Sequence, residues 1–174
     1  MEQTKKLVVC AMLIALGVVL GGMLSIPAIV LGGYSVKIGF GVLPVIISGI
    51  LYGPVYGGMV GGLTDLLQAV IFPKGAYEPW FTLVGVLFGL IPGLFFMKKQ
   101  NPSFLRILLA VAAGQILGSV VCNSILMVKL YGYPWDIMIV RAINQVVMIP
   151  LHTICSYYIL RLMSKAHITD RIRK

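Results

Sequence analysis

The chain has 174 residues, of which 59% are hydrophobic and only 11% are charged, and its mean hydropathy is +1.00. Soluble domains carry about a quarter charged residues, so this composition excludes a soluble fold. The net charge of +9 would suggest nucleic acid in a cytosolic domain. In so apolar a chain it indicates membrane topology instead, and we expect a lipid bilayer and no nucleic acid as partners.

Six apolar stretches follow one another along the chain, each close to the roughly 20 residues that a helix needs to cross a bilayer. They are residues 7–24, 36–52, 53–72, 80–97, 104–129 and 136–163. The first stretch lacks a small-residue cleavage site followed by a polar mature chain, so we interpret it as a retained helix and not a signal peptide. Pro54 predicts a tight turn between the second and third stretches. The predicted fold is an all-α integral membrane protein, with six transmembrane helices in a single domain over residues 1–174.

Basic residues predict the orientation of these helices. Six spans place both termini on one side of the membrane, and ten of the fourteen basic residues fall on that side. The opposite side has Lys37, Lys74 and Lys129, and Arg141 lies within the last span. The positive-inside rule therefore places both termini in the cytoplasm and predicts a multi-pass protein of the cell membrane.

Small residues recur at helical spacing in two of the spans. Gly53, Gly57 and Gly61 follow one another at every fourth position, and Ala11 and Ala15 repeat the spacing in the first span. Such rows allow helix backbones to approach each other closely in lipid. Packing within the chain and contact with a partner subunit both explain these rows.

Polar side chains within a span are costly unless they have a partner, a cavity or a ligand. Three predicted helices carry them in the outer half of the bilayer, at positions Asp65 and Gln68, at Gln115, Ser119 and Asn123, and at Arg141, Asn144, Gln145 and His152. The inner halves of the same helices are apolar, which excludes a continuous ion pore. We therefore predict a pocket that opens to the extracellular side.

Two of these polar groups have a purely structural alternative. Asp65 and Arg141 would also be explained by an ion pair that joins the third and sixth helices. His152 lies two residues after Pro150 and would also be explained by a kinked backbone whose free carbonyl it satisfies.

The predicted outer loops combine aromatic and basic residues. Tyr34 and Lys37 lie in the first outer loop, and Lys74, Tyr77 and Trp80 lie in the second. An aromatic belt at the membrane interface would explain the rings without a ligand. The outer charges sum to about +1, which favours a flat, mildly anionic ligand.

Catalytic and metal-binding motifs are absent from the sequence. It contains no G-x-x-x-x-G-K-[ST] phosphate loop, no H-E-x-x-H and no G-x-S-x-G, and its three cysteines have no metal-ligand spacing. We expect a subunit that is not an enzyme, holds no metal or cofactor, and draws its energy from partners.

Three segments resemble one family of membrane proteins. Residues 53–65, GPVYGGMVGGLTD, resemble the third-helix signature of S components of energy-coupling factor transporters, and residues 11–15, AMLIA, resemble their A-x-x-x-A docking motif. Residues 141–153, RAINQVVMIPLHT, are similar to the folate-specific S components. The resemblance implies a subunit that binds folate from outside with high affinity. It also implies association with a transmembrane coupling subunit and two cytoplasmic ATPases, and a reorientation that releases folate inward.

Residue chemistry suggests how such a site would bind folate. The Asp65 carboxylate would accept the adjacent ring N–H and amine of a pterin, and Arg141 would offer a planar fork to the ring or to the glutamate carboxylate. Asn144 and Gln145 would complete the ring edge, Tyr77 and Trp80 would stack, and Lys37 and Lys74 would meet the tail. The predicted binding set also includes Tyr34, Gln68, Asn123 and His152, and by resemblance Ala11 and Ala15 contact the coupling subunit.

Other functions remain open at this point. An S component for riboflavin, biotin or thiamin would share the third-helix signature, although the outer lysines disfavour cationic thiamin. A membrane-embedded enzyme acting on a lipid or prenyl substrate would use Asp65, Arg141 and His152, but it would lack the acid pair or metal cluster that such chemistry usually needs. An accessory subunit without a ligand would use the polar stripe only for helix packing.

Overall fold

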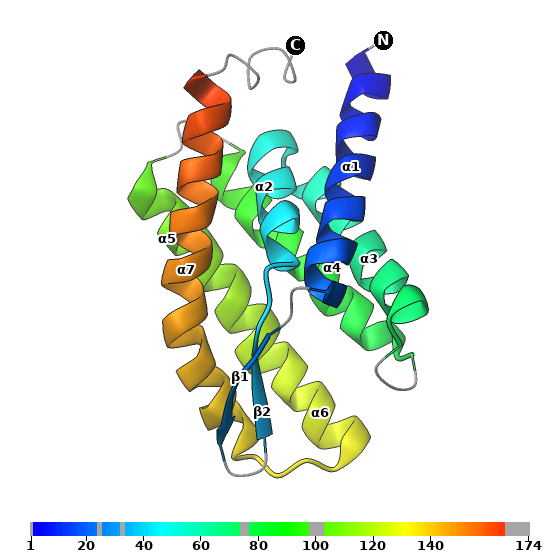
Figure 1. Ribbon diagram of the computed structural model, residues 1–174, viewed down its shortest axis with the longest axis vertical. Helices are drawn as coiled ribbons and strands as arrows, with labels where there is room; N and C mark the ends of the chain where they lie inside the picture. Colours follow the sequence, from blue (N-terminus) through cyan, green and yellow to red (C-terminus); the bar gives the residue numbers. More distant parts are fainter. Residues whose placement is uncertain (1, 24–25, 32–33, 74–76, 98–102, 166–174) are drawn as a thin grey trace.

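The computed structural model describes residues 2–23, 26–31, 34–73, 77–97 and 103–165, and within the two strands only the backbone. The described elements are α1 (Glu2–Met23), β1 (Ile26–Leu31), β2 (Tyr34–Ile38), α2 (Val42–Tyr52), α3 (Pro54–Ile71), α4 (Pro79–Phe96), α5 (Phe104–Gln115), the π-helix η1 (Ile116–Cys122), α6 (Asn123–Tyr131) and α7 (Ile137–Lys165). The start of α1 and the end of α7 lie at the same end of the molecule, and the β1–β2 hairpin lies at the other (Figure 1).

Four helical stretches among the described residues are long and apolar enough to cross a membrane. They are Gln3–Met23, Pro79–Phe96, Phe104–Tyr131 and Ile137–Lys165. The prediction of a helical membrane protein is thus confirmed. The second predicted span differs most from its prediction, because α2 has only 11 residues. At 1.5 Å per residue it is about 16 Å long, roughly half the hydrocarbon thickness.

A β-hairpin occupies the segment before α2, which the sequence analysis did not predict. β1 and β2 pair antiparallel, with Leu31 opposite Tyr34 and Ile26 opposite Ile38, and the register shifts between Pro27 and Ile29. The predicted start of a helix at residue 36 is therefore wrong. Both strands contain β-branched residues, which favour extended backbone, and helix α2 begins only after Gly39 and Gly41.

Glycines determine how α2, α3 and α4 meet. Gly53 has a φ of 89° at the α2–α3 junction and Pro54 starts α3, which confirms the predicted tight turn. A Cβ atom on Gly57 would meet the carbonyl oxygen of Gly89, and one on Gly61 would meet that of Gly85. The glycine row of α3 therefore packs against α4 within the chain, at backbone contact.

The apolar core lies towards the end of the molecule that holds the start of α1 and the end of α7. Nine of the eleven residues of α2 are buried, which explains why this helix is apolar on all sides. Four of them, Ile46, Ile47, Ile50 and Leu51, pack with residues of the last turn of α4, the middle of α5 and the end of α7, which are Phe96, Ile107, Ala110, Val111 and Leu160. The opposite half of the bundle, towards the hairpin, contains the cavity described next.

Candidate substrate-binding site

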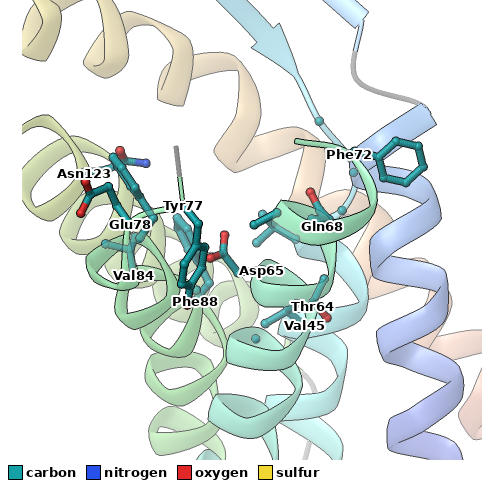
Figure 2. A pocket seen from close by; sticks show the side chains of 18 of the residues that line it. Val45, Thr64, Asp65, Gln68, Phe72, Tyr77, Glu78, Val84, Phe88 and Asn123 are labelled. Atoms are coloured by element: carbon teal, nitrogen blue, oxygen red, sulfur yellow. The ribbon is translucent and has the colours of Figure 1, made fainter. Parts of the chain in front are cut away.

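A cavity of about 550 Å³ opens between α3, α4, α6 and the start of α7. This volume lies within the roughly 300–1,000 Å³ of small-molecule sites. Its polar lining includes Thr64, Asp65, Gln68, Tyr77, Glu78, Asn123, Tyr131, Tyr133 and Arg141, and its apolar lining includes Val45, Phe72, Phe81, Val84, Phe88 and Met127. Figure 2 shows Asp65 on α3, with its carboxylate on the side of Tyr77.

The Asp65 carboxylate belongs to a short chain of hydrogen bonds that joins α3 to α4. Thr82 Oγ1 donates to Asp65 Oδ2 at 2.9 Å, and Tyr77 OH lies 3.0 Å from the same Thr82 oxygen. Asp65 and Tyr77 both line the cavity, whereas Thr82 is absent from its lining. Asp65 and Arg141 are both described, and the structure shows no ion pair between them. The alternative in which these two side chains join α3 to α7 therefore does not hold.

Three polar atoms in the cavity wall are buried without a hydrogen-bond partner. They are Thr64 Oγ1, Asn123 Oδ1 and Arg141 Nε. An unsatisfied buried polar group costs about 1–3 kcal/mol, and more if it is charged. These atoms come from α3, α6 and α7, so the cavity wall contains unsatisfied polar groups from three helices.

His152 lies behind the cavity wall. Its ring is 1% exposed, and Nε2 lies 3.0 Å from the carbonyl oxygen of Gly39 while Nδ1 contacts Gln115 Nε2. A carbonyl only accepts, so Nε2 carries the proton and Nδ1 accepts from the amide of Gln115. Gly39 lines the cavity directly after β2, and His152 therefore holds this wall segment in place against α5 and α7.

Comparisons with known proteins identify the family. A family model described as "ECF transporter, substrate-specific component" matches residues 5–163. The chain belongs to this family. A curated relative, "Folate transporter FolT" of Clostridium novyi, is 34% identical over 100% of this chain and 98% of its own length. The "Folate transporter FolT" of Leuconostoc mesenteroides is 26% identical over 97% of this chain and 91% of its own.

Solved structures share the fold of this S component. The structure described as "Crystal structure of FolT bound with folic acid" has a TM-score of 0.74 at 28% identity, covering 87% of this chain and 90% of that one. A second structure, "Structure and mechanism of the S component of a bacterial ECF transporter", has a TM-score of 0.75 at 21% identity and covers 94% and 97%. As a member of this family the chain is a membrane transport subunit and not an enzyme.

The S component brings five of the predicted binding residues to its cavity. They are Asp65, Gln68, Tyr77, Asn123 and Arg141. Trp80 is 54% exposed in the first turn of α4 and is not part of the lining, nor are Asn144, Gln145 or His152. The side chains of Tyr34 and Lys37 and the whole of Lys74 lie outside the described part of the chain.

Several lining residues were not predicted from the sequence. Thr64 is 3% exposed and immediately precedes Asp65, so its position next to the predicted acid was an available signal. Phe81, Val84, Gly85 and Phe88 follow the i, i+3, i+4, i+7 spacing of one helix face. Tyr131 and Tyr133, at the end of α6 and just after it, also line the cavity.

Charge in the cavity is lower than the sequence analysis expected for an anionic ligand. The described lining holds the two carboxyl groups of Asp65 and Glu78 and the one guanidinium of Arg141. Among the described residues, Arg141 is thus the one basic side chain of the lining.

Helix α1 has an open face of small and apolar residues. Gln68 Nε2 donates to the Gly17 carbonyl oxygen at 3.2 Å, which fixes the inner face of α1 on α3. Ala11 and Ala15 are exposed, beside Met12 at 66% and Leu16 at 50% exposure. This face of small and apolar residues is accessible to lipid or to another helix.

Proposed function

We propose that this S component captures folate from outside the cell in the 550 Å³ cavity and delivers it inward. The observation that carries the proposal is the combination, in one cavity, of the Asp65 carboxylate, the unpartnered Arg141 Nε and a wall of aromatic rings. Folate has complementary parts: a flat pterin with adjacent donors, an aminobenzoyl ring and an anionic glutamate tail. The FolT relatives and the fold shared with folic-acid-bound FolT support this choice of vitamin.

In this proposal the residues divide between the parts of folate. Asp65 accepts the ring N–H and amine of the pterin, and Phe81 and Phe88 lie beside the flat rings. Arg141 donates in a fork to a ring oxygen and nitrogen or to the tail carboxylate, while Thr64 and Asn123 satisfy the remaining polar edge. Lys37 and Lys74 attract the tail at the mouth.

The proposed topology has six membrane crossings with both termini in the cytoplasm. The start of α1 and the end of α7 share one end of the molecule, as an even number of crossings requires (Figure 1). The residues that begin α7 and end α3, including Arg141 and Phe72, belong to the cavity wall and would face outward. Together with the hairpin, the short α2 would form the second crossing of the cell membrane.

The proposed partners supply the energy for transport. A transmembrane coupling subunit would contact the exposed Ala11 and Ala15 of α1, where the absence of large side chains permits close helix approach. Two cytoplasmic ATPase subunits would drive the reorientation of the S component that releases folate inside.

Ligand-induced stabilisation of the purified protein tests the proposed function. A ligand that binds only the folded state stabilises it by RT ln(1 + [L]/Kd), about 2.7 kcal/mol at one hundred times Kd. We expect folic acid to raise the melting temperature, and thiamin, riboflavin and biotin at equal concentration to leave it unchanged. Stabilisation by another vitamin alone would reject folate, and stabilisation by none would reject a binding subunit.

A further inference from the structure

We propose that Thr82 is a positioning residue that makes one side of the cavity purely hydrogen-bond accepting and so selects the donor edge of the ligand. The inference rests on the proposed function, because it concerns how Asp65 meets the pterin. Thr82 itself is absent from the cavity lining and instead lines a shallow apolar groove on the outer side of α3 and α4, with Gly62 and Val86. It therefore acts on the ligand through its neighbours.

Proton accounting gives the Tyr77–Thr82–Asp65 chain a direction. A hydroxyl has one proton, and an ionised carboxylate only accepts. The Thr82 proton points to Asp65 Oδ2, across 2.9 Å, so the Thr82 oxygen must accept the proton of Tyr77, across 3.0 Å. The groups left for the ligand are then the second Asp65 oxygen and the lone pairs of Tyr77, all of them acceptors.

An all-acceptor side recognises a ligand edge with neighbouring donors. The ring N–H and amine of a pterin form such an edge, whereas a ring edge that carries carbonyl oxygens would face repulsion from the same oxygens. The Thr82 bond also fixes the plane of the carboxylate before the ligand arrives, which reduces the ordering cost of binding.

The tightness of the α3–α4 crossing makes this arrangement possible. A Cβ atom on Gly85, three residues beyond Thr82, would lie 2.9 Å from Asp65 Cβ. Glycine at this position leaves Asp65 and Thr82 close enough to bond across the two helices. The glycine pairs of this crossing therefore also serve the recognition of the ligand.

A double-mutant cycle on Thr82 and Asp65 separates this role from a general packing role. In Asp65→Asn, Thr82 would bond to the amide oxygen and leave the NH2 group facing the ligand's donors. In Thr82→Val/Asp65→Asn, the amide is free to turn its oxygen to the ligand. We therefore expect Thr82→Val alone to weaken folic acid binding roughly tenfold or more, and yet to reduce the penalty of Asp65→Asn.

The experiment measures the Kd of folic acid and the ligand-free melting temperature for the wild type, both single variants and the double variant. Thr82→Ser keeps the hydroxyl and should retain binding within a few-fold. Thr153→Val is a matched control, because Thr153 Oγ1 bonds only to the Ile149 carbonyl of its own helix, at 2.7 Å. We expect this control to bind folic acid like the wild type.

The outcomes distinguish the two proposals. A wild type that does not bind folic acid would reject the proposed function. Wild-type binding together with an unchanged Kd in Thr82→Val, or with a larger Asp65→Asn penalty in the Thr82→Val background, would reject only the positioning role. If Thr82→Val does not fold, the other two variants decide. Loss of folic acid binding in Thr82→Ser would reject the positioning role. Folic acid binding retained in Thr82→Ser, together with a weaker Kd in Tyr77→Phe, would support it.

Discussion

Replacement of Gly89 by alanine tests whether backbone contact between α3 and α4 holds the site together. A Cβ atom at Gly89 would overlap the carbonyl group of Gly57 and lie 3.0 Å from the Gly57 Cα atom. All of these neighbours are backbone atoms, which cannot rotate away as a side chain can. The two helices would therefore have to separate.

The free energy of this change follows from two opposing terms. An extra methyl group in a well-packed interior costs about 1–3 kcal/mol, and a rigid neighbour places the cost at the upper end. Alanine in place of glycine recovers about 0.5–1 kcal/mol through helix propensity. We expect Gly89→Ala to lose about 2–2.5 kcal/mol of stability, or roughly 4–10 °C in melting temperature for a chain of this size.

Gly114→Ala provides the matched control. Its Cβ atom would lie 3.5 Å from Pro92 Cδ, an ordinary van der Waals contact, and it sits in helix α5 where alanine is equally favoured. We expect Gly114→Ala to be as stable as the wild type or slightly more so. Both variants would be purified in the same detergent and melted with and without folic acid.

The binding measurement adds a second readout. Separation of α3 from α4 would lengthen the bond between Asp65 and Thr82, so Gly89→Ala should also bind folic acid more weakly. A Gly89→Ala protein that melts and binds like Gly114→Ala would refute the role of the glycine crossing.

Three further changes follow from the site. Arg141→Lys loses the planar fork and should raise the folic acid Kd at least about thirtyfold, at a cost of about 2–5 kcal/mol; a wild-type Kd would place Arg141 outside the ligand contact. Ala11→Trp or Ala15→Trp should leave folic acid binding intact and abolish co-purification with the coupling subunit, and normal co-purification by both variants would reject the docking face. His152→Phe removes the bonds to Gly39 and Gln115 and should lower both the melting temperature and the affinity, whereas an affinity loss with no change in melting temperature would indicate direct ligand contact.

Local chemistry explains which features the sequence was able to predict. The cost of polar groups in lipid identified Asp65, Gln68, Asn123 and Arg141 as cavity residues without any knowledge of packing. The turn at Gly53 and Pro54 was equally predictable from the sequence, because glycine permits a positive φ and proline fixes its own φ. Each of these signals depends on a residue and its nearest neighbours in the chain.

Packing explains what the sequence analysis missed. Asn144 and Gln145 share a stripe with Arg141, yet only Arg141 reaches the cavity, because α7 packs against α5 and η1 deeper in the bundle. The Gln115–Asn123 stripe was predicted on a regular α-helix, but residues 116–122 form a π-helix whose wider turn changes the relation between its two ends. Gln115 consequently bonds to His152 while Asn123 lines the cavity.

The sequence by itself determined the membrane class, the family resemblance and the residues whose chemistry requires a partner, since hydropathy, charge and motif spacing are properties of the linear chain. Only the tertiary structure decided that Thr82, and not Arg141, partners Asp65, that the glycine row packs inside the chain, and that residues 36–38 belong to a strand paired with β1 in place of helix. The physical reason is that Asp65 and Thr82, 17 residues apart in the chain, can bond only where α3 and α4 approach closely. That approach depends on glycines in both helices at once, which the linear sequence does not pair.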